Sequence, residues 1–175
     1  MSEDLPAPRH AHARGGPLQG GRDSRIEAAG APELVVVVGL QGAGKSTWVQ
    51  RHLAATHAVV SKDHWPRARR REARQQRVVA ELLAAGRSVV VDNTNPSPEE
   101  RAPLVAAARA AGLPVRAVWV DTPLAECLVR VEARNATREE RGRVPLVGVL
   151  SARRRFRPPS EVEGFDRVDV VRPGS

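Results

Sequence analysis

The stretch VVVVGLQGAGKSTW, residues 35–48, places four valines directly before a segment that contains three glycines, a lysine and two hydroxyl side chains. A short β-branched run of this kind predicts a strand that is covered on both faces. The segment after it matches the spacing of a phosphate-binding loop, which requires a strand before it and a helix after it. The sequence therefore predicts an α/β fold in which this loop binds a nucleotide.

The loop predicts how each of its residues would contact ATP. Its glycines let backbone N–H groups approach an anion, and the N-terminus of the following helix attracts negative charge. We expect Lys45 to bridge the β- and γ-phosphates, Ser46 to bind Mg²⁺ through its hydroxyl, and Thr47 to lie near the α-phosphate. The expected nucleotide-binding residues are those of the loop and of the first helical turn: Gly39, Gln41, Gly42, Ala43, Gly44, Lys45, Ser46 and Thr47.

Composition indicates one domain in a reducing compartment. Residues 1–31 are rich in Gly, Pro, His, Ala and Arg without hydrophobic periodicity, so we expect a disordered tail before one domain over residues 32–175. The single cysteine, Cys127, has no partner for an internal disulfide, and no apolar run is long enough to span a membrane. The N-terminus also lacks the apolar core of a secretion signal, so a cytoplasmic protein is expected.

The net charge favours a polyanionic partner without identifying it. The formal net charge is +8, which is common among proteins that bind nucleic acid. All the permanently basic residues are arginines except Lys45 and Lys62, a bias that codon usage alone can produce. Both interpretations stay open, although charges cancel within the tail and the excess therefore lies in the expected domain.

The rest of the chain alternates between strands and helices, which is typical of a parallel sheet with right-handed crossovers. The expected strands cover residues 33–39, 57–61, 87–92, 115–121 and 165–171. The expected helices cover residues 44–56, 65–85, 98–111, 123–136 and 145–155. The predicted fold class is therefore α/β, a P-loop domain with about five parallel strands flanked by helices.

Two acidic residues follow expected strands, at the edge where ligands collect in open α/β sheets. Asp92 ends the strand VVVD, from which an acid can hold Mg²⁺ beside a phosphate loop, although Asp also suits the start of a turn. Asp63 follows the strand HAVVS in the sequence SKDHWP, and it is the best candidate base for the proton of an acceptor hydroxyl. The alternative role for Asp63 is N-cap of the following helix.

Arginines supply positive charge near these acids. On the helix expected over residues 65–85, four of them share one stripe at spacings of three and four: Arg67, Arg70, Arg71 and Arg74. This stripe either faces the cleft and binds an acceptor or forms a solvated basic surface. The polar stretch ARNATREERGR, residues 133–143, is typical of a mobile lid, in which Arg134 and Arg138 would clamp the phosphates of ATP on closing.

Four segments of the chain resemble the kinase domain of polynucleotide 5′-hydroxyl kinases, which is also the kinase half of polynucleotide kinase-phosphatases. In chain order they are GLQGAGKST, SKDHWP, VVVDNTNPSPEER and RPPSEVEGF, and the resemblance extends over residues 34–171. It implies an adenylate-kinase-like fold with a short lid that holds ATP and Mg²⁺. The DxDGT phosphatase signature is absent, so the resemblance is to the kinase half alone.

The resemblance also implies roles for individual residues. Asp63 would deprotonate the 5′-hydroxyl, and Arg134 would be the essential arginine of the lid. Phage-type enzymes place an acceptor-binding arginine three residues after the base, where this chain has Pro66, followed at once by Arg67. Asp92 matches the acid of the DNTN motif. The residues expected to bind the acceptor are Arg67, Arg70, Asp92, Asn93, Thr94 and Asn95.

Three functions fit these features. The first is ATP- and Mg²⁺-dependent phosphoryl transfer to a hydroxyl, with the 5′ end of DNA or RNA as the favoured acceptor. The second is a small-molecule kinase of the same fold, acting on an antibiotic, a sugar or a nucleoside. The third is a regulatory P-loop ATPase that transfers no phosphate. The chain lacks the NKxD motif of GTPases and the length for a mechanical domain, which favours transfer over switching.

Overall fold

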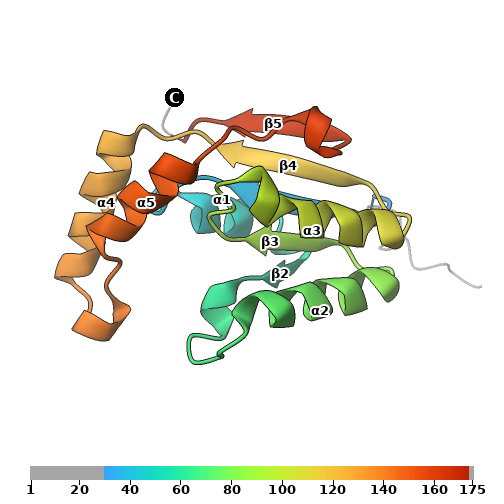
Figure 1. Ribbon diagram of the computed structural model, residues 1–175, viewed down its shortest axis with the longest axis horizontal. Helices are drawn as coiled ribbons and strands as arrows, with labels where there is room; N and C mark the ends of the chain where they lie inside the picture. The colour runs from blue at the N-terminus through green and yellow to red at the C-terminus, as the bar shows by residue number, and fades with distance from the viewer. Residues whose placement is uncertain (1–29, 174–175) are drawn as a thin grey trace, which may run out of the picture.

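The computed structural model describes residues 30–173, and the predicted tail lies outside these residues apart from its last two positions. Within them, five parallel strands form one sheet in the order β2-β3-β1-β4-β5 (Figure 1). The strands are β1 (Leu34–Val38), β2 (Ala58–Val60), β3 (Val89–Asp92), β4 (Val115–Val120) and β5 (Arg167–Val171). The prediction of a parallel α/β fold is confirmed.

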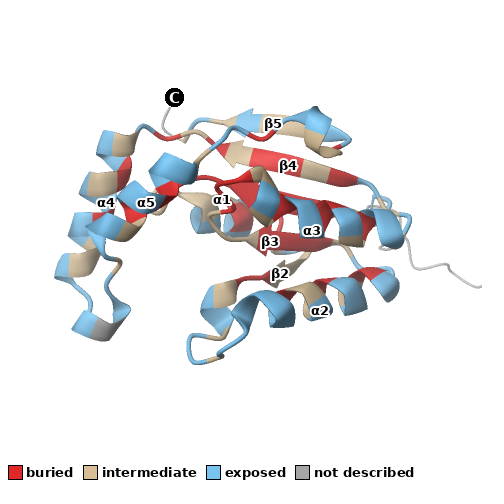
Figure 2. Cartoon of the chain, viewed as in Figure 1, coloured by how far each residue is buried: buried red, intermediate tan, exposed pale blue. Residues whose placement is uncertain are grey.

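Helices cover both faces of this sheet, so that the buried residues form a continuous layer inside the molecule (Figure 2). They are α1 (Lys45–His52), α2 (Arg71–Ala84), α3 (Pro98–Ala110), α4 (Leu124–Ala136) and α5 (Leu146–Arg155). α2 and α3 supply the core on one face, whereas α1, α4 and α5 supply it on the other. No helix of the described part of the chain is both long and apolar enough to cross a membrane.

β1 is enclosed by strands on both sides and by apolar layers on both faces. All of its residues are 0% exposed, which explains why the sequence shows an unbroken apolar run instead of alternation. The register pairs Val37 of β1 with Asp92 of β3 on one side and with Val118 of β4 on the other. The loop after β1 and the acid at the end of β3 therefore leave the sheet next to each other.

The helix expected over residues 65–85 begins later than predicted, at Arg71. A short 3₁₀ helix, η1 (Lys62–His64), follows β2, and turns connect it to α2. Trp65 precedes Pro66, and the residue before a proline is disfavoured in the α-helical region. The chain therefore turns once more before α2 can start.

The late start of α2 changes where the arginines lie. Arg67 and Arg70 are in turns, whereas Arg71 and Arg74 belong to the helix, and all four are exposed. The prediction of one stripe of four arginines along a helix face is therefore wrong. The basic side chains gather instead around the start of α2.

A buried ion pair joins the C-terminal segment to the loop after β3. Arg101 of α3 is 0% exposed, and it donates to the two carboxylate oxygens of Glu163 at 2.7 and 2.6 Å. The same guanidinium donates to the carbonyl oxygens of Asn95 and Arg157 at 2.9 and 3.1 Å. The sequence segments VVVDNTNPSPEER and RPPSEVEGF are thus held together by one buried cation.

We expect Glu163→Ala to lower the free energy of unfolding by about 3 kcal/mol, because it leaves the Arg101 guanidinium buried without its counter-charge. Glu161→Ala is the matched control, since Glu161 belongs to the same 3₁₀ helix, η3 (Glu161–Glu163), and is exposed. The control should stay within about 0.5 kcal/mol of the wild type. Urea unfolding followed by circular dichroism measures both, and equal stabilities of the two variants would contradict the role of the ion pair.

Candidate active site

The phosphate-binding loop connects β1 to α1 and owes its shape to its glycines. Gly42 and Gly44 adopt φ angles of 82° and 96°, which residues with a side chain rarely adopt. A Cβ atom at Gly42 would collide with the carbonyl oxygen of Cys127 on α4. Among the described residues, no protein acceptor receives the amides of Gly42, Gly44 or Lys45. These free N–H groups at the start of α1 fit the phosphates of ATP.

The Lys45 side chain lies within this loop, where its ammonium donates to the carbonyl oxygen of Leu40 at 2.9 Å. Burial lowers the pKa of Lys45 to about 8, despite the opposing negative charge of Asp92. The charge of Asp63 also opposes the shift, and that of Arg134 adds to it. Charged side chains from β3, η1 and α4 therefore act on the lysine of the loop at the carboxyl edge of the sheet.

Asp92 lies where a metal ligand beside the loop was predicted. It ends β3, next to the strand that leads into the loop, and Ser46 follows in the first turn of α1. Among the described residues, no three His, Cys, Asp or Glu side chains cluster in a way that could hold a metal ion. Mg²⁺ commonly keeps water and phosphate ligands and needs few protein ligands, so Asp92 and Ser46 are a chemically suitable pair. Their binding of Mg²⁺ stays a prediction.

Asp63 lies in η1, directly after β2. Ser61 is the N-cap of η1 and Arg70 that of α2, so the alternative role of Asp63 as a helix N-cap is wrong. Its side chain is exposed and forms no ion pair with any side chain that the structure describes. The carboxylate is therefore available to accept a proton, and its role as a base stays a prediction.

Asn93 connects the end of β3 to two other elements. Its side-chain oxygen accepts a hydrogen bond from the backbone amide of Lys62 in η1 at 2.9 Å. Its NH₂ group donates to the side-chain oxygen of Gln75 on α2 at 2.6 Å. The side chain predicted to bind an acceptor is thus engaged within the protein, and the predicted acceptor contact is not tested by these bonds.

Thr94 and Asn95 fasten the start of the phosphate loop. The Thr94 carbonyl oxygen accepts from the Gly39 amide at 3.1 Å. Asn95 has a φ angle of 44°, a value that Asn tolerates better than most residues, and it is 2% exposed. Its side chain donates to the carbonyl oxygen of Val37 at 2.8 Å. The motif therefore holds β1 and the loop in place, and contact of Thr94 and Asn95 with a substrate stays a prediction.

The predicted lid belongs to an arm that projects from the sheet, in which α4 and α5 run side by side (Figure 1). A 3₁₀ helix, η2 (Glu140–Gly142), lies at its tip. Asn135 closes the tip, because its side chain donates to the carbonyl of Val144 at 2.8 Å and accepts from the amide of the same residue at 2.9 Å. Arg138, predicted to bind ATP, is exposed and donates to the Gly142 carbonyl at 3.2 Å. Its contact with ATP stays a prediction.

Two buried polar atoms near the loop have no hydrogen-bond partner among the residues that the structure describes. They are the Nε atom of Arg134, in the last turn of α4, and the side-chain oxygen of Gln41 in the loop. Buried polar atoms in folded proteins are normally hydrogen-bonded, because an unpaired one retains its desolvation cost. The unpaired atoms therefore fit a site that is completed by a ligand, and a nucleotide is the ligand that the adjoining loop suits.

Several polar residues that organise the site were not predicted from the sequence: Ser61, Gln75 and Asn135. Ser61 carried a usable signal, since serine before a helical turn is a common N-cap. Gln75 and Asn135 carried none, because their partners lie 18 and 9 residues away in the chain. Cys127 is buried in the core, where burial raises the pKa of its thiol, and this disfavours a nucleophilic role.

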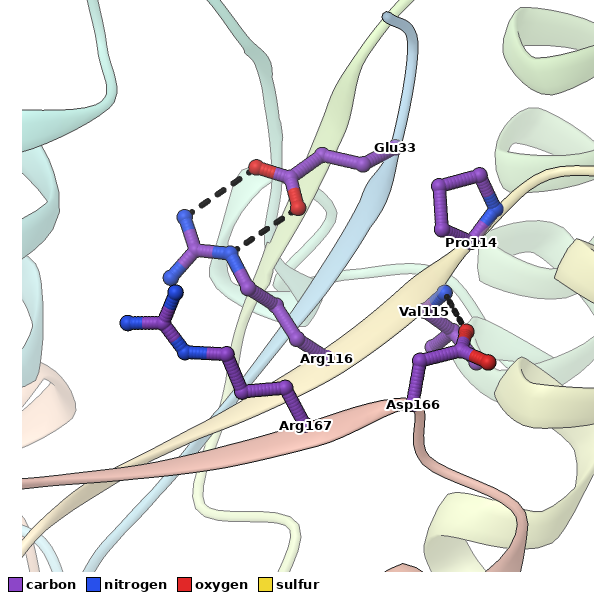
Figure 3. Close-up of a pocket in the computed structure, with 6 residues that line it drawn as sticks. All are labelled: Glu33, Pro114, Val115, Arg116, Asp166 and Arg167. Atoms are coloured by element: carbon purple, nitrogen blue, oxygen red, sulfur yellow. Dashed lines mark hydrogen bonds and ion pairs between the residues drawn. The ribbon is translucent and has the colours of Figure 1, made fainter.

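A separate hollow of about 430 Å³ lies at the opposite edge of the sheet, where β1, β4 and β5 begin (Figure 3). Arg116 donates to both carboxylate oxygens of Glu33 there, at 2.9 and 3.1 Å, and pairs with Asp169 at 3.1 Å. Burial alone would raise the pKa of Glu33, but Arg116 lowers it below its ordinary value. Because these charges neutralise one another, the hollow does not compete with the loop as an active site.

The chain resembles known proteins along most of its length. Residues 34–159 match the model of the AAA domain family. A bifunctional polynucleotide phosphatase/kinase of Schizosaccharomyces pombe is 29% identical over an alignment of 143 residues that covers 79% of this chain. The chain spans 33% of the length of that relative. The resemblance to polynucleotide kinases that the motifs predicted is therefore confirmed as a similarity.

Solved structures show the same fold at low sequence identity. Chaetomium thermophilum Kti12 in complex with ADP-AlF3 is 16% identical with a TM-score of 0.60, covering 81% of this chain and 89% of that one. The Mycobacterium tuberculosis APS kinase CysC, in complex with AMPPNP and APS, is 22% identical with a TM-score of 0.57, covering 83% and 90%. The fold is therefore that of P-loop kinases and related nucleotide-binding proteins.

We expect Lys45 to titrate near pH 8 in the free protein, since burial disfavours its charged form. ATP should raise this pKa because the phosphates stabilise the ammonium. ATP affinity should therefore be highest below pH 8 and fall as pH rises through 8. Above pH 8 the lysine of the free protein is neutral, so it must take up a proton when ATP binds. NMR of ¹⁵N-lysine-labelled protein measures the titration, and Lys62→Arg leaves Lys45 as the one lysine of the chain. Titration near 10.5 without ATP would contradict its burial.

Proposed function

The chain belongs to the AAA domain family, and we propose that it transfers a phosphoryl group from ATP to the 5′-hydroxyl end of a polynucleotide. The observation that carries the proposal is that the register places Asp92 beside the strand that leads into the loop, and that Lys45 feels the charges of Asp92, Asp63 and Arg134 from three other elements. Binding of a nucleotide by the loop requires the lysine and none of the other three groups. Transfer to an alcohol needs, in addition, a base and positive charge at the reacting phosphate.

In the proposed reaction, the Asp63 carboxylate accepts the proton of the acceptor hydroxyl. The acceptor oxygen forms a bond to the γ-phosphorus while the bond from that phosphorus to the β–γ bridging oxygen breaks, and ADP leaves. Lys45 and Arg134 stabilise the negative charge on the transferring group. Mg²⁺ held by Asp92 and Ser46 would neutralise charge on the β- and γ-phosphates.

The surface next to Asp63 supports a polyanionic acceptor. Five arginines of this surface are exposed, and none forms an ion pair within residues 30–173: Arg67, Arg69, Arg70, Arg71 and Arg74. Trp65 is half-buried beside them, with the Arg74 guanidinium 5.1 Å from its ring centre. Phosphates bind to exposed arginines, and bases stack on aromatic rings, which together suit a single-stranded end.

Helix stability does not explain these arginines. They gather at the N-terminus of α2, where the helix dipole makes positive charge unfavourable. By contrast, Arg153, Arg154 and Arg155 lie in the last turn of α5, where the dipole favours cations. A cluster of charge that costs the helix stability is better explained by a ligand. The similarity to the polynucleotide phosphatase/kinase of Schizosaccharomyces pombe supports the same acceptor class.

We expect the protein to label 5′-hydroxyl oligonucleotides from γ-labelled ATP in the presence of Mg²⁺. Asp63→Asn should lower this rate by about 100- to 10,000-fold, the usual contribution of a general base, while ATP affinity stays within about twofold. Glu81→Gln is the control, since Glu81 is an exposed acid on α2 whose ion-pair partner is Arg77.

The same assay separates the three functions. A panel of sugars, nucleosides and aminoglycosides, offered in place of the oligonucleotide, tests small alcohols as acceptors. Labelling of a small alcohol alone would replace the polynucleotide by that acceptor. Release of phosphate without any labelled acceptor would favour a regulatory ATPase. Full activity of Asp63→Asn would remove the proposed base.

We expect Arg134→Ala to lower the transfer rate by about 1,000-fold, as the loss of an arginine that stabilises a phosphoryl transition state does. Its melting temperature should not fall, because the change removes a buried polar atom that has no protein partner. Arg87→Ala, at an exposed turn after α2, is the control. Thermal unfolding and initial rates measure the two effects. An unaltered rate in Arg134→Ala would exclude it from the reaction.

A further inference from the structure

η1 carries the proposed base but has little of its own to hold it in place. It is a single 3₁₀ turn, and none of its three residues is buried. The ion pair between Lys62 and Glu72 joins two partly exposed side chains, and such pairs contribute little to stability. The position of Asp63 must therefore depend on hydrogen bonds to the backbone of η1.

Those hydrogen bonds converge on Asn93. Its side-chain oxygen accepts from the Lys62 amide at 2.9 Å and from the Ser61 hydroxyl at 3.5 Å. The Ser61 hydroxyl oxygen in turn accepts from the amide of Asp63 at 3.3 Å. The first two amides of η1 are thus held, directly or through one hydroxyl, by the residue that follows Asp92. One amide side chain therefore links the two acids proposed for catalysis.

The chemistry of the donors fixes how this link is oriented. A backbone amide can only donate, so the atom of Asn93 that faces Lys62 must be the oxygen. The NH₂ group of Asn93 then faces α2 and needs an acceptor, which the side-chain oxygen of Gln75 provides at 2.6 Å. Gln75 is 1% exposed, so water does not replace this bond. Gln75 thereby holds Asn93 in the one orientation that binds η1.

We propose that Asn93 is a positioning residue that fixes Asp63 relative to Asp92 and Lys45, and that Gln75 fixes Asn93. The inference rests on the phosphoryl transfer proposed above and deepens it. It also replaces a direct contact of Asn93 with the acceptor, because both ends of its amide are occupied by the protein. Since Gln75 lies on α2, the same hydrogen bonds link the base to the helix whose start carries Arg71 and Arg74.

The test compares Asn93→Ala, Asp63→Asn and the double variant. Asn93→Ala should lower kcat by about tenfold or more and leave the KM for ATP within about twofold, because misplacing a base affects the reaction and not nucleotide binding. The double variant should be no slower than Asp63→Asn, because Asn93 acts through Asp63. If the double variant is slower than Asp63→Asn by the same factor by which Asn93→Ala is slower than the wild type, Asn93 acts independently of Asp63. That result would overturn the proposal in favour of a direct contact between Asn93 and the substrate.

Gln75→Met provides a second variant that keeps the volume of the side chain and removes its acceptor. It should reproduce the kcat loss of Asn93→Ala in part, because the NH₂ group of Asn93 then lacks its acceptor. Gln76→Met is the matched control, since the side chain of Gln76 donates to Glu72 and has no bond to Asn93. Equal activity of Gln75→Met and Gln76→Met would exclude the proposed role of Gln75 in fixing Asn93.

Hydrogen exchange gives a readout that does not depend on the acceptor. In Asn93→Ala, the amides of Lys62 and Asp63 should exchange about tenfold faster, while amides of β1 remain protected. Unchanged exchange at both amides would overturn the proposal even if activity fell. A wild-type protein that labels no acceptor would refute the proposed function, and the exchange rates would still decide whether Asn93 holds η1.

Discussion

The burial of β1 between β3 and β4 is the constraint on which the site depends. Its neighbours and the two apolar layers leave no part of the strand in contact with solvent, so its polar loop can emerge only at the end of the strand. The parallel register brings the end of β3 to the same place, which puts Asp92 beside the loop. Lys45 then bonds within its own loop, where the charges of three other elements act on it. A parallel sheet thus assembles, from distant positions in the chain, a set of charges that no local segment contains.

Sequence reasoning succeeded where the signal was local. The valine run, the glycine spacing and the strand-to-helix alternation each depend on neighbouring residues, and they were sufficient for the sheet, the loop and the placement of Asp92 and Asp63 at strand ends. The predicted start of α2 at residue 65 is wrong. The arginines have helical spacing, but Pro66 disfavours a helical conformation at the residue before it. Arg101 and Glu163 are 62 residues apart, so no local pattern joins them. The partner of Asn93 on α2 was equally hidden, since Gln75 lies 18 residues away in the chain and no local pattern pairs the two.

The structure divides its polar side chains by charge. Neutral amides do the holding: Asn93 binds η1, Asn95 binds β1, and Asn135 closes the arm. The charged groups that act on Lys45 are left for a ligand, and among the described residues one of them, Arg134, has a buried atom without a hydrogen-bond partner. This division has an electrostatic advantage, because a carboxylate used as a structural acceptor would add negative charge where phosphates must bind. Arg101 and Arg116 also hold the fold, and carboxylates neutralise both: Glu163 beside Arg101, and Glu33 and Asp169 beside Arg116.

The tip of the arm is stapled by the two hydrogen bonds between Asn135 and Val144. These bonds tie the end of α4 to the chain that leads into α5, so a closing motion of the predicted lid would have to originate where α4 and α5 join the sheet. The residues beyond the two bonds would then move together with the helices. A change in the number of these residues would alter how far the arm reaches over a long acceptor, while the places where the arm joins the sheet stay the same.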